Sequence, residues 1–423
     1  MDEFKNMMDS ADSTDNIEDK IFIYSEIVSK TQTDKDFRKI VNVQEFIKIS
    51  EKYKSVKEYP LKIAILGYKS DLVGHWDPFT CETGLPGSEE CAVYASQELA
   101  NKGYSVTLYM NPHPDSIWSS SFSNPKWVSE DTWYNDNNTE NYDLVLTWRR
   151  YDPSAGRLRG KKVFFWSHDS PPYLQPGQCF PQFGRFDGIC ILSEHHRKQF
   201  NCWPGFNDIP YTICGNGIVP EQFNDPIKHT NPYSIGYFSN YSRGLIFLII
   251  LWPKIRELFP EATLSICYGR ETWNTISHEQ LQFIITKIGE YKNMGVTEHG
   301  KVGHQELASI MKQTSVWAYP CNTETETFCI TATKCQASGC IPVTTRIGAL
   351  NETVHPDAPH IDSINTSNGI TLYFQLLIDT LNRIKESDSK DIILERQKYI
   401  EFAHKFSWEA CVDKWIQLYN SIC

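Results

Sequence analysis

The chain has 423 residues, 40% of them hydrophobic and 22% charged, which is the balance of a globular protein with enough length for two or three domains. Its formal net charge is -11. Such a chain repels a polyanion on average, so nucleic acid is a poor candidate partner.

The N-terminal sequence MDEFKNMMDSADSTDNIEDK is acidic and lacks the apolar core of a signal peptide. The longest apolar run, IFLIILW at 246–252, is too short to span a bilayer. The 13 cysteines are irregularly spaced, with no CxxC pair and no Cys/His group at zinc spacing. We therefore expect a cytoplasmic protein with reduced thiols and no metal site, for which only peripheral membrane contact stays open.

Residues 1–58 precede the first strand pattern. Residues 1–20 are predicted to be a disordered acidic tail, and apolar residues at helical spacing over 21–57 predict one or two amphipathic helices. Asp34 and Asp36 form the sequence Asp-Lys-Asp in this extension. Because they do not follow a strand, we expect them on a solvated helix face rather than at a metal ion.

Short apolar runs then alternate with helical stretches, which predicts βαβ units and two doubly wound parallel sheets, an α/β fold. The first set of expected strands covers 62–66, 105–110, 142–148, 161–167 and 187–193. The second set covers 234–239, 262–269, 295–302, 315–320 and 340–345.

We expect a Rossmann-like domain over 59–225, completed by a C-terminal helix at 405–423, and a second one over 226–404. Ligands of such sheets bind beyond the carboxyl ends of the strands. The expected site is therefore a cleft between the two domains.

The segment YPCNTETETFCITATKCQASGCIPVTT at 319–345 resembles the donor-binding signature of the retaining family 4 glycosyltransferases, which have the GT-B fold. That signature opens with Glu-x-Phe-Gly and has a second Glu eight residues after the first. Glu326 and Phe328 match the opening. Lys334 stands where the family has the second Glu, which holds the nucleotide ribose. Because a lysine cannot accept hydrogen bonds, this contact must be altered.

Three further segments extend the resemblance. Arg243 precedes a glycine where the family has a basic residue on the diphosphate, and Arg270 is a candidate for a second one. Gly87 and Ser88 lie in a segment similar to the family's Gly-Gly-Ser-Glu loop, which approaches the donor. His168 follows a strand where the family places a residue against the transferred sugar; the alternative is a histidine that caps the turn before the following prolines. The remaining donor-binding residues that the resemblance implies are Val302, Thr327, Cys329 and Ile330.

The resemblance covers about residues 61–420 and implies a glycosyltransferase that moves a sugar from a nucleotide diphosphate sugar to a glycan or glycoconjugate acceptor. It further implies retention of configuration and no metal or other cofactor. The implied catalytic residues are His168 beside the anomeric centre, Glu326 on the sugar and Arg243 on the diphosphate, which the backbone near Phe328 would also contact.

Two alternatives stay open: a nucleotide-sugar epimerase of the same fold, and a non-catalytic sugar-binding protein, which Lys334 favours. A nicotinamide oxidoreductase is disfavoured because no GxGxxG follows a strand. The base (uridine, guanosine or another), the sugar and the acceptor are not set by the sequence. Trp118, Trp127 and Trp133 are either stacking platforms for an acceptor or loop core.

Overall fold

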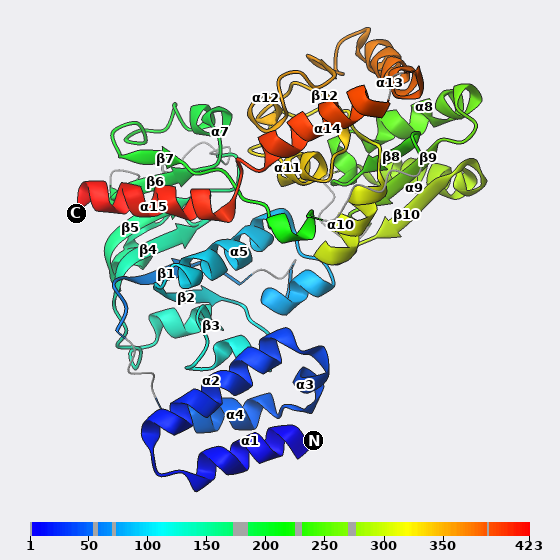
Figure 1. Cartoon of the computed structure of the whole chain (residues 1–423). Coiled ribbons are helices and arrows are strands. Elements are labelled where there is room, and N and C mark those ends of the chain that lie inside the picture. Colours follow the sequence, from blue (N-terminus) through cyan, green and yellow to red (C-terminus); the bar gives the residue numbers. More distant parts are fainter. Residues whose placement is uncertain are drawn as a thin grey trace.

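The computed structural model describes residues 2–53, 58–69, 73–171, 185–224, 231–269, 276–386 and 389–423. It contains two parallel β-sheets, each flanked by helices, and a group of helices at the N-terminus (Figure 1). The sheet orders are β3-β2-β1-β4-β5-β6-β7 and β10-β9-β8-β11-β12-β13. In both sheets the strand order reverses beside the first strand of that sheet, as in doubly wound folds.

The first sheet consists of β1 (Lys62–Leu66), β2 (Ser105–Met110), β3 (Lys126–Ser129), β4 (Tyr142–Trp148), β5 (Gly160–Trp166), β6 (Gly188–Ile191) and β7 (Tyr211–Ile213). The second consists of β8 (Ser234–Tyr237), β9 (Thr263–Cys267), β10 (Val296–Gly300), β11 (Val316–Tyr319), β12 (Ile341–Thr345) and β13 (His360–Ile361). The helices are α1 (Asp2–Ser13), α2 (Ile17–Thr33), α3 (Lys35–Ile40), α4 (Val43–Ser50), α5 (Gly87–Asn101), α6 (Pro153–Arg157), α7 (Glu194–Gln199), α8 (Leu245–Leu258), α9 (His278–Glu290), α10 (His304–Gln313), α11 (Ile330–Ala337), α12 (Leu350–Thr353), α13 (Gly369–Glu386), α14 (Ser389–Ala403) and α15 (Trp408–Ile422).

All ten strands expected from apolar runs are present. These ten are the central strands of the two sheets together with β6 and β10. Because helices cover both faces of each sheet, most of these strands are buried on both sides and have a continuous run of apolar residues. The strands that the sequence did not reveal are β3, β7 and β13, which lie at sheet edges and are short and partly exposed. The predicted α/β fold with two Rossmann-like sheets is confirmed.

The prediction of a disordered tail over residues 1–20 was wrong. Residues 2–13 form α1, in which Phe4, Met8 and Ala11 recur at helical spacing and are buried. These side chains join the same hydrophobic cluster as Phe46 of α4 and Ile63 of the first sheet. The acidic composition hid this stripe of three apolar residues.

Asp34 and Asp36 lie where the sequence predicted, on an exposed helix end. The Asp34 carboxylate accepts hydrogen bonds from the backbone N–H groups of Asp36 and Phe37 and so caps α3. These two hydrogen bonds lower the pKa of the Asp34 carboxyl below its ordinary value, because their effect outweighs the opposite effect of burial.

The C-terminal helix α15 returns from the second sheet to the first, where it packs against α5, β6 and β7 (Figure 1). Where the chain crosses itself, the N–H of Ile218 donates to the carbonyl of Phe406 at 2.9 Å. A Cβ on Gly217 would lie 2.2 Å from the backbone nitrogen of Trp408, so this crossing requires glycine.

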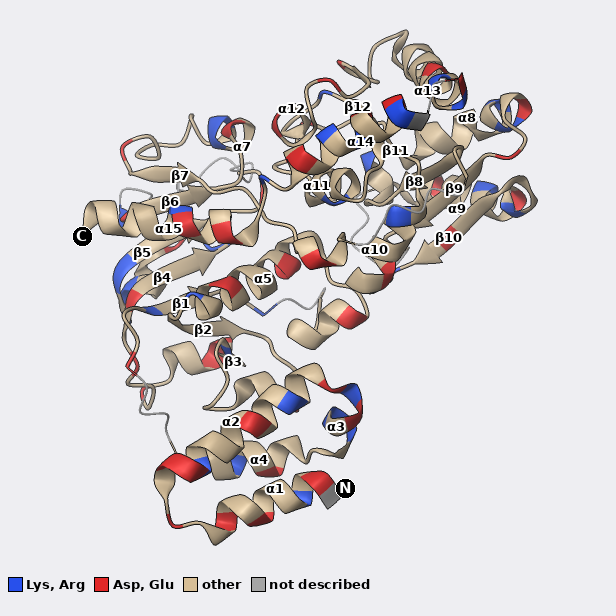
Figure 2. Cartoon of the chain, viewed as in Figure 1, with Lys and Arg blue, Asp and Glu red and all other residues tan. Residues whose placement is uncertain are grey.

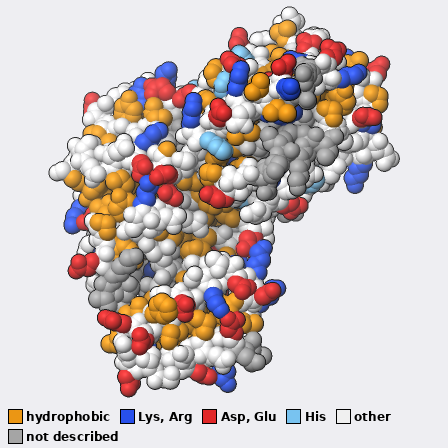
Figure 3. Space-filling view, viewed as in Figure 1, with side chains coloured by type: hydrophobic (Ala, Val, Ile, Leu, Met, Phe, Trp, Pro, Cys, Tyr) orange, Lys and Arg blue, Asp and Glu red, His pale blue; other side chains and the backbone are white. Residues whose placement is uncertain are grey.

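Within the described ranges, no helix combines the length and apolarity needed to cross a bilayer. Every described cysteine is a free thiol. Basic and acidic side chains are intermixed along the helices (Figure 2) and are scattered over the face shown in Figure 3. No single basic surface for a polyanion is visible on that face.

Candidate functional site

A cleft of about 490 Å³ lies where the carboxyl ends of the two sheets face each other. Its lining comes from the segments after β1, β4, β5, β6 and β7 on one side and after β8, β9 and β11 on the other. Of the residues expected at the site, the following line it: Gly87, Ser88, His168, Arg243, Glu326, Thr327, Phe328, Cys329 and Ile330. The fold thus brings together residues that are up to 243 positions apart in the chain (87 to 330).

Two helices point their N-termini into this cleft. A Cβ built on Gly87, the first residue of α5, would lie 3.3 Å from Cγ2 of Ile330, the first residue of α11. Neither helix receives a hydrogen bond from the side chain of its N-cap residue, which is Pro86 in α5 and Cys329 in α11. The first N–H groups of a helix and its dipole attract anions, so the two N-termini form one electropositive wall.

Arg243 adds a fixed positive charge beside these helix ends. Its side chain is 27% exposed, and its Nη1 lies 3.6 Å from Oε2 of Glu326. Within the described part of the chain, this Nη1 has no hydrogen-bond partner. Burial alone would lower the pKa of the guanidinium, but the nearby Glu326 carboxylate raises it above its ordinary value, so Arg243 stays charged.

Glu326 presents a carboxylate next to this charge. Its Oε2 accepts a hydrogen bond of 2.8 Å from the hydroxyl of Tyr319, the last residue of β11. The side chain is only 12% exposed, and the pair with Arg243 holds it in a defined orientation. Such a carboxylate can accept further hydrogen bonds from the hydroxyl groups of a sugar.

On the facing side, Arg149 forms a charged cluster that sequence reasoning missed. Its guanidinium donates to both oxygens of Asp169, at 2.6 and 2.9 Å, and to Oε1 of Glu89 at 3.2 Å. The Arg149 side chain is 7% exposed and that of Glu89 5%. Burial raises the pKa of the Glu89 carboxyl, an effect that Arg149 opposes. The position of Arg149 directly after an expected strand was a signal that could have identified it.

His168 lies between this cluster and the second domain. Its ring packs against Trp166 with 4.7 Å between centroids, and its Nε2 is buried without a hydrogen-bond partner among the described residues. Burial, with Arg149 and His196 adding to it, lowers the pKa of His168 well below its ordinary value, so the imidazole is neutral. Its carbonyl accepts a hydrogen bond from Thr327 at 3.0 Å, which links the two sides of the cleft.

Backbone strain is concentrated in the same cleft. Arg149, Tyr268 and Cys329 are the non-glycine residues with positive φ in the described ranges, at 58°, 142° and 66°, and all three line it. This conformation is unfavourable for residues with a Cβ and is typical of binding and catalytic sites. Cys329 stands where the donor-binding signature has its glycine, and its φ of 66° is a conformation that glycine adopts at no steric cost.

Other residues expected at the site lie elsewhere. Lys334 does not line the cleft: it is buried one turn inside α11, where it pairs with Glu90 of α5 at 2.5 Å. Val302 lines a smaller adjoining cavity. Arg270 lies outside the described residues. Trp118, Trp127 and Trp133 are 7%, 0% and 0% exposed and belong to the core, so they are not stacking platforms.

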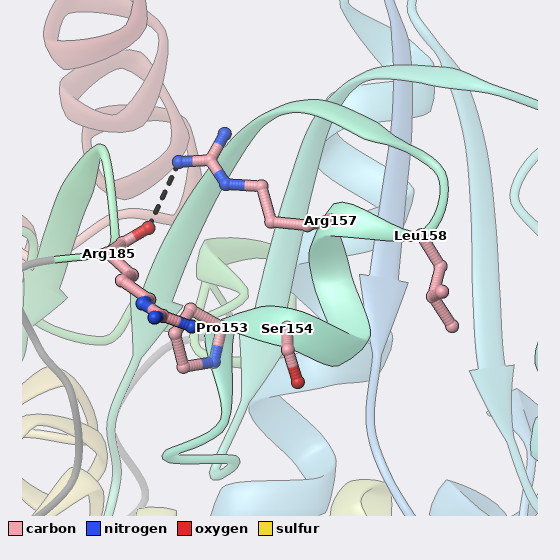
Figure 4. A pocket seen from close by; sticks show the side chains of 5 residues that line it. All are labelled: Pro153, Ser154, Arg157, Leu158 and Arg185. Carbon is pink, nitrogen blue, oxygen red and sulfur yellow. Dashed lines mark hydrogen bonds between the residues drawn. The ribbon is translucent and has the colours of Figure 1, made fainter.

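A separate hollow lies on the outer side of α6, between Pro153, Ser154, Arg157, Leu158 and Arg185 (Figure 4). Arg157 there donates to the backbone carbonyl of Arg185 at 3.0 Å and pairs with Asp187 at 2.7 Å. None of the five residues that line this hollow has a carboxylate or an imidazole. The interdomain cleft is therefore the stronger candidate for a functional site.

Among the described residues, no group of three or more His, Cys, Asp or Glu side chains is arranged to hold a metal ion. The charged groups of the cleft are instead paired with one another, as Arg149 is with Asp169 and Arg243 with Glu326.

The chain matches no protein-family model and no curated protein sequence. Its structure is similar to that of a sucrose-phosphate synthase from Thermosynechococcus elongatus, with a TM-score of 0.61 and 15% identity over 86% of this chain and 99% of that one. The catalytic domain of starch synthase IV from Arabidopsis thaliana, bound to ADP and acarbose, gives 0.56 and 12% over 86% and 99%. HepE of Anabaena, in complex with UDP-glucose, gives 0.53 and 14% over 86% and 98%.

These similarities and the two facing sheets define a class of two-domain α/β proteins with a cleft at the strand ends. Within that class the chain has the GT-B fold, as the sequence predicted. Identities of 15% or less show the fold alone, so the activity must be argued from the residues of the cleft.

Proposed function

We propose that this protein is a glycosyltransferase that uses a nucleotide diphosphate sugar as donor and a glycan or glycoconjugate as acceptor, without a metal ion or other cofactor. The observation that carries the proposal is the position of Arg243. Its half-buried, charged guanidinium, with a buried Nη1 that has no hydrogen-bond partner in the described structure, lies beside the first turn of α11 and the carboxylate of Glu326.

This arrangement matches the two halves of such a donor. The diphosphate would lie on the N-termini of α5 and α11 and on Arg243, which supply positive charge where a leaving phosphate develops negative charge. Glu326 would accept hydrogen bonds from the sugar hydroxyls. These groups would take the role that a divalent cation has in other transferases.

The acceptor would approach from the side of the first sheet. Asp169 is 43% exposed there, with both oxygens held by Arg149, and can orient a hydroxyl group. Neutral His168 would lie beside the anomeric carbon and donate or accept a hydrogen bond through Nε2.

We further propose that configuration is retained. The bond between the anomeric carbon and the phosphate oxygen breaks, the acceptor oxygen bonds to that carbon on the same face, and the hydroxyl proton passes to the leaving phosphate. Domain closure around the cleft would exclude water as a competing acceptor. A cytoplasmic location, where nucleotide sugars are available, belongs to this proposal.

The experiment is a turnover assay with a panel of nucleotide diphosphate sugars, with and without mixed glycan acceptors, and with a chelator in every reaction. We expect one donor to be consumed when an acceptor is present, and NMR of the product to show the anomeric configuration of the donor. Consumption without acceptor that yields an isomer of the donor sugar would identify an epimerase instead.

A donor that binds but is not consumed under any condition would identify a non-catalytic sugar-binding protein. The pairing of Lys334 with Glu90, where the donor signature has a ribose-binding carboxylate, is the observation that favours this second candidate. Loss of turnover in Glu326→Gln, with the fold unchanged, would separate catalysis in this cleft from a contaminating activity.

A further inference from the structure

Three ionisable side chains from both domains meet outside the cleft lining, behind the N-termini of α5 and α11. Glu90 of α5 lies with Oε1 2.5 Å from Nζ of Lys334 on α11 and with Oε2 3.5 Å from Nε2 of His304 on α10. The three side chains are 4–7% exposed. His304 Nδ1 contacts the hydroxyl of Tyr94 at 3.0 Å, and this hydroxyl accepts a hydrogen bond from Gln222.

The charges of this cluster balance as one carboxylate and one ammonium. Burial, together with the ammonium of Lys334, lowers the pKa of His304, although Glu90 opposes the shift, so the imidazole is neutral. A buried ion pair is weak evidence for stability, because an apolar pair of similar size is often at least as stable. A role in binding is therefore a better account of why two charges are buried between the domains.

The position of the pair relative to the cleft indicates what it would bind. Glu90 lies three residues after Gly87 on α5, and Lys334 lies four residues after Ile330 on α11. Both are thus one helical turn, about 5 Å, behind the N-termini that form the expected diphosphate site. A group attached to the inner phosphate would reach this pair.

A cavity of about 70 Å³ lies at this place, lined by Glu90, His304 and Val302 among others. Tyr268 lines both this cavity and the cleft, so the two spaces adjoin. On the side of the first domain, the loop 84–86 lines this cavity. The loop lies close against the second domain, since a Cβ on Gly84 would lie 2.6 Å from the carbonyl oxygen of Val302. The cavity is too small for a nucleoside, so we expect this loop to move away from Val302 when a ligand enters.

We propose that Glu90 is the residue that accepts hydrogen bonds from the ribose hydroxyls of the donor, with Lys334 as its positioning partner. The proposal rests on the proposed function. It places the carboxylate for the nucleoside on the first domain, so recognition of the nucleotide is shared between the domains and linked to their closure. Lys334 stands where the signature has a glutamate, and in this proposal Glu90, its ion-pair partner, supplies the carboxylate in place of that glutamate, so the ribose contact is kept.

The test is calorimetric binding of nucleoside diphosphates and of their 2′,3′-dideoxy analogues, with inorganic pyrophosphate as the probe of the phosphate site alone. We expect the wild type to prefer the ribose form of one nucleotide by at least about tenfold, the usual size for hydrogen bonds to a charged group. In Glu90→Gln the preference should fall below about threefold, while pyrophosphate affinity stays within about twofold. Glu98→Gln, on the same helix, is the matched control and should keep the preference.

Lys334→Met tests the positioning role: it should reduce the same preference and leave pyrophosphate binding unchanged, and thermal unfolding checks that each variant is folded. A preference that is unchanged in Glu90→Gln would overturn the proposal while the proposed function stands. Equal strengthening of both analogues in Glu90→Gln and Lys334→Met would overturn it in favour of a latch between the domains. If the wild type binds no nucleoside diphosphate, the proposed function fails, and this proposal fails with it.

Discussion

The buried cluster around Arg149 allows a quantitative prediction about stability. In Arg149→Met the Glu89 carboxylate, only 5% exposed, loses its charged partner at 3.2 Å. Breaking a buried ion pair by removing one partner costs roughly 3–5 kcal/mol. Asp169 is 43% exposed and can be solvated in the variant, so the loss of its ion pair with Arg149 adds little to this cost. We therefore expect the free energy of unfolding of the first domain to fall by roughly 3–5 kcal/mol.

The assay is urea unfolding followed by circular dichroism, comparing the first transition because two domains need not unfold together. Adding Glu89→Gln to Arg149→Met should restore at least ~1 kcal/mol, since no buried carboxylate is then left without a partner. Lys161→Met is the control: its pair with Asp143 is on the surface, with Lys161 74% exposed, so its removal should change the stability far less than Arg149→Met does. A loss in Arg149→Met no larger than in this control would refute the reasoning.

Two further predictions concern pH and the backbone. Burial lowers the pKa of fully buried His196 to about 4, so the unfolded state binds the proton more tightly. The contribution of neutral His196 to stability is then fully present above the unfolded pKa of ~6.5 and is lost as pH falls toward about 4, by on the order of 3 kcal/mol. Thermal unfolding measured between these pH values should show a shallower decline in stability for His196→Asn than for the wild type. An equal decline in both proteins would contradict this prediction. Gly244 has φ 102°, and a Cβ there would lie 2.0 Å from the carbonyl oxygen of Pro320, so Gly244→Ala should lower the unfolding free energy by more than ~1–2 kcal/mol. Gly289, in helix α9 with nothing within 4 Å of a Cβ, is the control: Gly289→Ala should stabilise by ~0.5–1 kcal/mol, and the same sign for both would be evidence against this account.

The central strands could be predicted from the sequence because burial on both faces leaves an unbroken apolar run, as in Ile63 to Leu66. The edge strands β3, β7 and β13 could not, since partial exposure allows polar residues there. The helix α1 was missed because its three buried side chains are separated by acidic and polar ones.

At the cleft, the place of the residues after β8 and β11 in the lining could be predicted because a local signature carries them. The ion pairs of Arg149 and Glu90 could not, because they depend on partners that are distant in the chain; for Arg149 the sequence offered only its position directly after a strand. Arg149 meets Asp169 and Glu89, which are 20 and 60 residues away, and Glu90 meets Lys334 across the domains. Conversely, the signature drew attention to Lys334, but only the fold shows that this lysine is buried, paired with Glu90 and outside the cleft lining.

The central claim is that the cleft binds the diphosphate of a nucleotide through Arg243. It is tested most directly by calorimetry with nucleoside diphosphates in the presence of a chelator, for the wild type, Arg243→Met and Lys254→Met, an exposed position on the neighbouring helix α8. We predict that the wild type and Lys254→Met bind one nucleotide equally and that Arg243→Met binds it about 10–100-fold more weakly, as expected for lost charge-assisted hydrogen bonds. Equal affinity in Arg243→Met, or no binding by the wild type, would contradict the account.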